Sequence, residues 1–245
     1  LKEAGHIDGA YYHMPFDTGF TSLTYDADAV QFPDGEETWA VLLDSAYKGK
    51  MSIFRGPDEV IEMAALINRG AKDPTVLTAD EVAAAKDTAM KVKENLRNYW
   101  TSENDTVNDF VNGNLVVAST WNSGFLRIRN HPKMKGRNIK YMQPKEGRLI
   151  WVCGTILSAQ SQQPGRAMTA MASVDTAAAA AALTNDFGYA SAQQKGVQEL
   201  IKDKELIALF GLDDPTLWQP PKGWIQKQVE PYKEYIAAGQ EVIDS

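Results

Sequence analysis

Two tryptophans stand at places where an aromatic ring could face a bound molecule. Trp121 follows the apolar run of residues 116–120, and Trp151 lies in a second apolar run that comes after a turn at Gly147. In open α/β sheets, ligands bind outside the carboxyl ends of the strands, so rings at those ends face the binding cleft. We therefore predict that Trp121 and Trp151 contact a small ligand, with packing in the core as the alternative for each.

Arg55 introduces a second kind of chemistry. It precedes Gly56 and Pro57, and Pro57 suits the first turn of a helix. Free backbone N–H groups and the helix dipole favour an anion at such a helix start, and Arg55 adds a fixed positive charge. This grouping is typical of a clamp for a carboxylate or a phosphonate. The plainer alternative is that Arg55 points to solvent or pairs with Asp58.

Other kinds of site lack the residues they need. The histidines His6, His13 and His131 show no zinc-ligand spacing, and the chain contains none of the common dinucleotide, phosphate-loop or serine-hydrolase motifs. Cys153 is the only cysteine and lies in an apolar run, where we expect a buried and unreactive thiol. We predict no metal, no cofactor and no enzymatic activity. A small α/β enzyme that uses Cys153 or Glu59 is the weaker alternative, because no motif places a base beside either residue.

The composition and net charge argue against some classes of binding partner. The 245 residues are 44% hydrophobic and 23% charged, as in ordinary globular proteins. Lys and Arg number 25 against 32 Asp and Glu, and the net charge of -7 has the wrong sign for a nucleic acid partner. No run of about 18 apolar residues, the length needed to span a bilayer, occurs in the sequence.

The elements that must position these residues alternate between strand and helix. Residues 78–81 carry a capping-box pattern that opens a long amphipathic helix, expected to reach residue 100. Such alternation predicts an α/β protein with a parallel or mixed sheet flanked by helices. The predicted strands cover residues 11–16, 20–25, 51–54, 115–120, 139–142 and 149–157, and the predicted helices cover residues 39–43, 57–68, 78–100, 106–111, 123–129 and most of the remainder.

Several stretches, taken in order, resemble the spermidine/putrescine-binding proteins of ABC importers. They span nearly the whole chain and keep the order of the family. The stretches are YKG at residues 47–49 with EVIEMA at 59–64, STWNSGF at 119–125, PKEG at 144–147 before the strand of Trp151, and GY at 188–189 after an alanine-rich helix.

The resemblance implies a two-lobe fold, the type II fold of periplasmic binding proteins, with mixed sheets flanked by helices and the ligand between the lobes. The first lobe would comprise residues 1–25 and 152–189, and the second lobe residues 26–151 and 190–245. Strands would cross between the lobes near residues 25, 151 and 189. Because residues 1–16 resemble the middle of the first lobe, that lobe is expected to be incomplete.

The resemblance also implies ligand contacts. Position by position, Trp121, Trp151 and Tyr189 match aromatic ligand contacts of the family, and Glu59 matches a carboxylate contact. Gln226 is a weaker match to a family glutamine, because its spacing after Trp224 differs. Aromatic rings and carboxylates together recognise methylenes and ammonium groups.

Two departures from the family change the expected ligand. Arg55 and Gly56 stand where the family has an acidic pair, and Cys153 stands where it has an aspartate. Burying a second ammonium group without a carboxylate partner would be costly. We therefore expect a small organic cation or zwitterion that is polyamine-like, an amino acid or a betaine, and the two departures weigh against a diamine or triamine; a small organic anion is the alternative.

The resemblance also implies an oligomeric state, a cellular location and a partner protein. We expect a monomeric substrate-binding component, located in the periplasm or anchored by lipid outside the cytoplasmic membrane. It would deliver its small-molecule ligand to an ABC importer permease in the inner membrane.

Overall fold

Strands β3 (Met14–Asp26) and β8 (Arg148–Thr155) each run from one compact unit of the protein into the other. The structure, a computed structural model, describes residues 6–7, 9–70, 72–192, 196–227 and 232–245. Unit 1 comprises residues 1–20 and 150–215, and unit 2 comprises residues 21–149 and 216–245. This division differs from the predicted lobes mainly at residues 190–215, which belong to unit 1. There Ser191 of β9 (Ala190–Ser191) pairs with Asp17 of β3.

The sheet of unit 2 brings three strand ends to one edge. Strands β5 (Leu96–Trp100) and β6 (Val117–Trp121) both lie parallel to β4 (Met51–Phe54). Antiparallel to β6 runs the second half of β3, with Thr21 opposite Trp121. The sheet also includes β7 (Ile139–Tyr141), which pairs with β3, and β10 (Gly223–Ile225), which neighbours β8.

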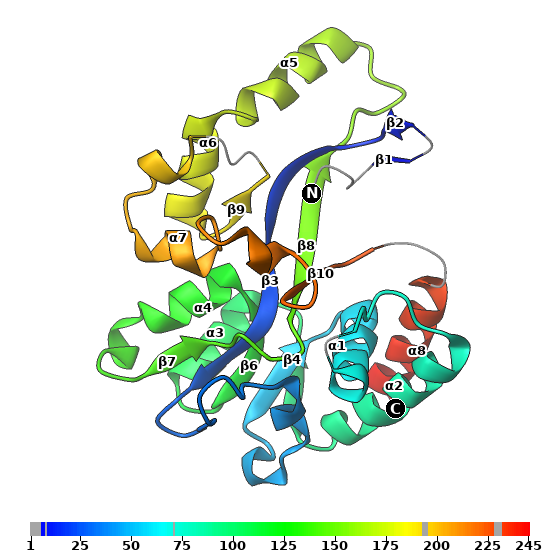
Figure 1. Ribbon diagram of the computed structural model, residues 1–245, viewed down its shortest axis with the longest axis vertical. Coiled ribbons are helices and arrows are strands. Elements are labelled where there is room, and N and C mark those ends of the chain that lie inside the picture. The colour runs from blue at the N-terminus through cyan, green and yellow to red at the C-terminus, as the bar shows by residue number, and fades with distance from the viewer. Residues whose placement is uncertain (1–5, 8, 71, 193–195, 228–231) are drawn as a thin grey trace. The chain divides into compact units, whose positions relative to one another are not determined.

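Helices cover this sheet in two groups (Figure 1). One group, α1 (Pro57–Arg69), α2 (Ala79–Lys93) and α8 (Tyr232–Asp244), packs together beside β4. The other group, α3 (Glu103–Val111) and α4 (Asn122–Arg129), packs near β6 and β7. Apolar side chains of α1, α2 and α8 meet in one core cluster, which therefore holds α1 firmly in place. Short 3-10 helices cover Trp39–Leu43, Ser45–Tyr47 and Pro132–Met134, and another covers Pro215–Trp218.

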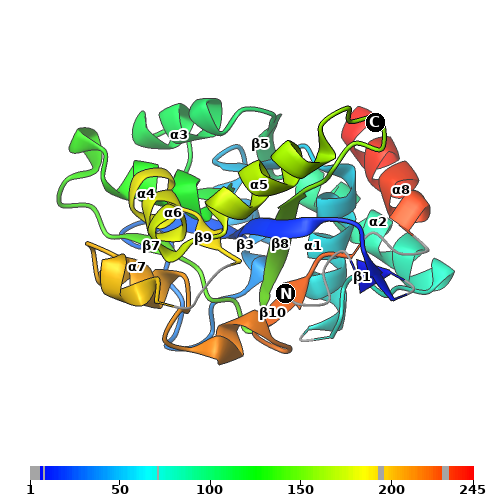
Figure 2. The ribbon, with the colours of Figure 1, turned by 90° about the horizontal axis from the view of Figure 1, so that it is seen from above.

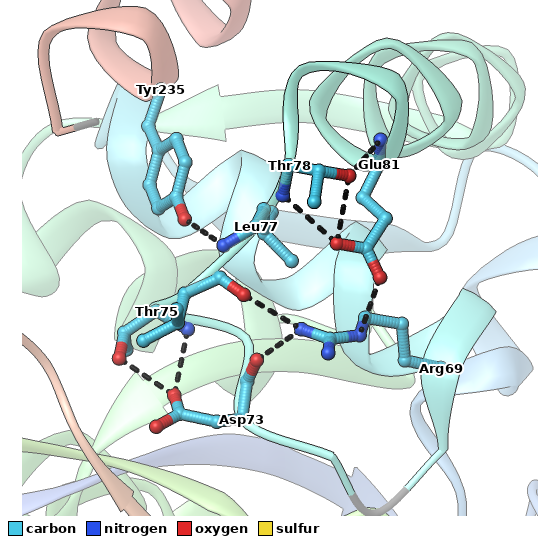
Figure 3. Close-up of polar contacts among 8 residues, drawn as sticks. Arg69, Asp73, Thr75, Leu77, Thr78, Glu81 and Tyr235 are labelled. Carbon is cyan, nitrogen blue, oxygen red and sulfur yellow. Dashed lines mark hydrogen bonds and ion pairs between the residues drawn. The ribbon is translucent and has the colours of Figure 1, made fainter. Parts of the chain in front are cut away.

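The start of α2 is fixed as predicted. Thr78 and Glu81 form a capping box, in which the Glu81 N–H donates to Thr78 Oγ1 at 3.3 Å and the Thr78 N–H donates to Glu81 Oε2 at 2.9 Å. Just before it, the Leu77 N–H donates to the hydroxyl of Tyr235 on α8 at 2.7 Å (Figure 3). The bond from Leu77 to Tyr235 ties the segment before α2 to the last helix.

Unit 1 is built around the first half of β3 and the second half of β8. Helix α6 (Ala177–Ala182) continues into a π-helical turn (Leu183–Phe187) and lies against β9 (Figure 2). Every residue of α5 (Pro164–Val174) is at least partly exposed. The unit also contains β1 (His6–Ile7), β2 (Ala10–Tyr11), a 3-10 turn (Gln198–Leu200) and α7 (Glu205–Leu209).

No single helix among the described residues has both the length and the apolar composition needed to cross a membrane. The helices Pro164–Val174 and Ala177–Phe187 meet those two criteria only when taken together, and they are bent by 57° relative to each other.

Two predicted elements were wrong. Residues 11–16 and 20–25 were expected to form separate strands, but β3 is continuous because its buried hydroxyl groups find partners on neighbouring strands. Thr18, for example, donates to the Trp151 carbonyl on β8 at 2.6 Å. The helix expected to reach residue 100 ends at Lys93 instead. The residues that follow form β5, whose backbone pairs with β4.

Candidate functional site

An aromatic cluster marks the carboxyl ends of the three parallel strands in unit 2. It consists of Phe54, Trp100 and Trp121, whose ring centroids lie 4.7 to 5.4 Å apart. Trp100 is buried and donates its indole N–H to the Ser119 carbonyl at 3.0 Å. Trp121 is only half-buried, so it can present part of its ring to a ligand while Phe54 and Trp100 support it. Sequence analysis did not identify Phe54 or Trp100.

Helix α1 carries two buried carboxyl groups one turn apart, Glu59 and Glu62, which we call the carboxylate pair. Glu59 is 9% exposed and Glu62 is 1% exposed. The Thr21 hydroxyl donates to Glu59 Oε2 at 3.3 Å, and Gln226 Nε2 donates to Glu62 Oε2 at 2.7 Å. The structure thus places the predicted Gln226 next to Glu62, which sequence analysis did not name.

The carboxylate pair has no positive partner in the described part of the chain. None of its lysine, arginine or histidine side chains forms an ion pair with Glu59 or Glu62. Burial raises the pKa of Glu59 to about 8, with a further contribution from Asp58, while the Thr21 hydrogen bond opposes the shift. Glu59 is therefore mostly protonated at neutral pH in this structure.

Glu62 behaves in the same way. Burial raises its pKa well above the ordinary value, against the opposing hydrogen bond from Gln226, and Asp58, Glu59 and Asp73 add to the increase. The site therefore has two buried carboxyl groups whose ionised forms a bound cation would stabilise.

The loop after α1 places Asp73 close enough to Glu62 to affect its pKa, and hydrogen bonds within the loop hold the Asp73 side chain in position (Figure 3). The Thr75 N–H and hydroxyl donate to Asp73 Oδ1 at 2.9 and 2.6 Å. Arg69 donates to the carbonyls of Asp73 and Val76, and it also pairs with Glu81 at 3.3 Å. Lys227 Nζ also lies 3.3 Å from Asp73 Oδ2, so this acidic side chain near Glu62 is held in place and already has a positive partner.

Arg55 pairs with a residue far along the chain. Its Nη2 lies 3.0 Å from Asp244 Oδ1 on α8, and the two side chains are 45% and 57% exposed. The expected alternative partner, Asp58, instead accepts a hydrogen bond from the Tyr232 hydroxyl at 3.1 Å. Exposed ion pairs contribute only about 0–1 kcal/mol, so a ligand anion could compete for Arg55. Its role as an anion clamp stays a prediction.

The N-terminus of α4, which begins directly after Trp121, already holds an acidic side chain. The Ser123 hydroxyl donates to both carboxyl oxygens of Glu103 at 2.9 Å, and the Gly124 N–H also donates to this group. Burial raises the pKa of Glu103, and these hydrogen bonds oppose that increase. This helix terminus is thus supplied with an internal acceptor, which makes it a poor receptor for a ligand anion.

In unit 1 the structure brings together two predicted ligand contacts. The rings of Trp151 and Tyr189 meet edge to face, with centroids 5.1 Å apart and planes at 86°. Both side chains are half-buried. The Thr18 hydroxyl donates to the Trp151 carbonyl at 2.6 Å and holds this part of β8 against β3. No described residue accepts a hydrogen bond from the buried indole N–H of Trp151.

The expected burial of Cys153 was wrong, because its side chain is exposed. Residues 148–150 of β8 are buried, but the strand becomes exposed as it continues through unit 1. Partial burial raises the pKa of the thiol, and the nearby Asp17 raises it further. Within the described chain, no group of three or more His, Cys, Asp or Glu side chains could hold a metal ion.

Comparison with known proteins gives a family match and a distant relative. The family model described as bacterial extracellular solute-binding protein matches residues 1–208. The putrescine/agmatine-binding protein of Pseudomonas aeruginosa strain PAO1 is 25% identical over 167 residues, which cover 64% of this chain and 44% of that protein. The match therefore spans less than half the length of this curated relative.

Solved structures show the fold. The PBP MotA from A. tumefaciens B6 in complex with glucopine has a TM-score of 0.75 at 19% identity, covering 99% of this chain and 75% of that one. The Tp0655 lipoprotein of Treponema pallidum has a TM-score of 0.75 at 15% identity, with coverages of 96% and 70%. The PBP AgtB from A. tumefaciens R10 in complex with agropinic acid has a TM-score of 0.68 at 19% identity, with coverages of 96% and 70%. The predicted type II fold of periplasmic binding proteins is confirmed.

Proposed function

The chain belongs to the bacterial extracellular solute-binding protein family, and on that premise we propose that it is the solute-binding component of an ABC importer. It captures a small organic cation or zwitterion and delivers it to a permease in the inner membrane. Members of this family bind solutes, so we assign no catalytic role to Glu59 or Cys153.

The carboxylate pair is the observation that carries the proposed charge of the ligand. Glu59 and Glu62 are buried on α1, and the hydrogen-bond donors that reach them from the described residues, Thr21 and Gln226, are neutral. An ammonium group beside Glu59 would stabilise its ionised form and gain an ion pair, whereas an anion there would favour the neutral, protonated form and gain none. The half-buried ring of Trp121 supports the same choice, because indole faces attract cations.

Arg55 keeps a zwitterion within the proposal. Its guanidinium stands just before the start of α1, only four residues from Glu59, and its partner Asp244 is exposed. A ligand with a cationic and an anionic end could use Glu59 for the first and displace Asp244 from Arg55 with the second. Among the similar proteins, one is described as putrescine/agmatine-binding and others are complexed with glucopine and agropinic acid, so these relatives support a small organic solute without selecting its charge.

Membership of the family also supports a cellular location and an oligomeric state. We propose a monomer that works in the periplasm or anchored by lipid outside the cytoplasmic membrane. The family description as extracellular supports this location, and a structurally similar protein from Treponema pallidum is a lipoprotein.

Calorimetric titration with putrescine, agmatine, glycine betaine and a set of amino acids tests the proposal. Trp121→Ala should weaken binding of the preferred compound by about 1–3 kcal/mol through lost cation–π contact and burial. Phe187→Ala, which removes a ring that is 68% exposed in unit 1, should leave the affinity unchanged. Binding of organic anions alone, or equal affinity of the Trp121→Ala variant, would contradict the proposal.

A further inference from the structure

Unit 1 contains an acidic residue, Asp17, on the strand that neighbours both β9 and the strand of Trp151, and it was not among the predicted ligand contacts. Asp17 lies on β3, where it pairs with Ser191 of β9, and its neighbour Thr18 is bonded to the Trp151 carbonyl. Asp17 is half-buried. Among the described basic side chains, none forms an ion pair with it.

Strand register shows which side chains share a face. Thr18 pairs with Ala190, so Tyr189 comes beside Gly19, on the face of β3 that Asp17 also occupies. Gly19 has no side chain, which leaves room for the ring of Tyr189 to reach Trp151 across the strand.

The same alternation applies along β8. Trp151 and Cys153 are two residues apart in the strand and therefore point to one face. Because the Trp151 ring touches Tyr189, this face is the one that carries Asp17. One face of unit 1 thus presents a carboxylate, an edge-to-face aromatic pair and an exposed thiol.

We propose that Asp17, Trp151 and Tyr189 form a cation-binding subsite in unit 1, in which Asp17 supplies the negative charge. A carboxylate beside aromatic rings is the arrangement that recognises an ammonium group. That this subsite serves the transported solute rests on the proposed function, whereas its preference for cations does not.

The electrostatic surroundings agree with this geometry. Burial raises the pKa of the Asp17 carboxyl, and its own backbone N–H opposes the shift, so a positive partner would relieve a cost already present. Asp17 also affects the thiol of Cys153, because the nearby carboxylate contributes to the raised pKa of that thiol. His13, which directly precedes β3, lies beside Gly154 of β8.

This subsite changes how the departure at position 153 is interpreted. The family resemblance implied an aspartate there, and its replacement by Cys153 argued against a polyamine. Asp17, on the adjacent strand β3, supplies a carboxylate on the face that carries Cys153. A ligand with an ammonium group at this end is therefore compatible with the sequence.

Cys153 allows a test that needs no knowledge of the solute, since it is the only cysteine. The intact protein is treated with two methanethiosulfonate reagents, one carrying a trimethylammonioethyl group and one a sulfonatoethyl group. Each forms a disulfide with the Cys153 thiolate and releases methanesulfinate. Because both react with the same thiolate, the ratio of their rates reports the local preference for charge and cancels changes in the thiol pKa.

Asp17→Asn should lower the cationic-to-anionic rate ratio by about five-fold, the effect of one nearby carboxylate. Asp175→Asn, which removes the same charge from an exposed position in unit 1, should leave the ratio nearly unchanged. Equal ratios for the native protein and Asp17→Asn would overturn the subsite, whether or not any solute binds.

Calorimetry then separates the two proposals. If putrescine binds and Asp17→Asn weakens it at least ten-fold, the subsite serves the solute. If none of the compounds binds while the rate ratio still depends on Asp17, the subsite stands and the proposed cationic solute fails.

Discussion

Glu59 links the charge of the ligand to the stability of the fold. Its pKa is 4.5 in an unfolded chain and about 8 in the folded protein, where burial dominates. Between these values the folded protein keeps a proton that the unfolded chain releases, so stability falls as pH rises from about 4.5 to about 8. The part of the stability that Glu59 contributes is complete below that window and absent above it.

Glu59→Gln should remove this dependence. At pH 8.5 we expect the variant to be more stable than the native protein by on the order of 4 kcal/mol, and at pH 5 by less than about 1 kcal/mol. Urea unfolding at both pH values measures the difference. Glu241→Gln, at an exposed carboxylate of α8, is the control and should show no such pH dependence. An equal effect of Glu59→Gln at the two pH values would show that Glu59 is not protonated in the fold.

Site residues could be predicted where their neighbours in the sequence mark their position, and not where a partner distant in the sequence defines their role. Trp121 ends an apolar run, so its place at the edge of the sheet could be predicted. Asp17 could not be predicted, because its importance comes from strands that are distant in sequence. The same holds for Arg55, whose partner Asp244 lies 189 residues away. Glu62 did leave a signal, since its three-residue spacing from Glu59 puts both on one helical face.

At the scale of elements, the position of α1 depends on how closely α8 approaches it. Gly239 of α8 lies against the start of α1, where a Cβ atom would come within 1.9 Å of the Pro57 carbonyl oxygen. Gly239→Ala should therefore push the two helices apart and destabilise the protein by roughly 1–3 kcal/mol. Urea unfolding measures this loss.

Gly165 provides the matched control for this substitution. It lies in α5 with open space around it, so Gly165→Ala should be neutral or slightly stabilising. If Gly239→Ala were as well tolerated as Gly165→Ala, the close packing of α1 and α8 would be wrong.

The predicted elements succeeded where local patterns decide and failed where pairing decides. The capping box at Thr78 begins α2 as expected, because its hydrogen bonds lie within one turn. The residues after Lys93 continue the apolar pattern of a helix, yet they form β5, since β4 offers them backbone hydrogen bonds. Likewise, Thr18, one of the polar residues that divided β3 in the prediction, donates its hydroxyl to the Trp151 carbonyl on β8.

At the scale of the whole molecule, the order of motifs predicted the fold because the family's elements follow one another in a fixed sequence. The type II fold was confirmed by solved structures that cover 96–99% of the chain. The division into units was less predictable. Residues 190–215 join unit 1 through contacts of β9 and of the helical segments near α6, which no single motif encodes.

The net charge of -7 acts on ligand capture from a distance. A negatively charged protein attracts a dication such as putrescine before contact, and this increases the association rate at low salt. Raising NaCl from 10 mM to 1 M shortens the Debye length from about 30 to about 3 Å, so the rate for putrescine should fall several-fold. Glycine betaine has no net charge, and its rate should change little. Stopped-flow tryptophan fluorescence measures both rates, and a salt-independent rate for putrescine would mean that capture depends on the local carboxylates alone.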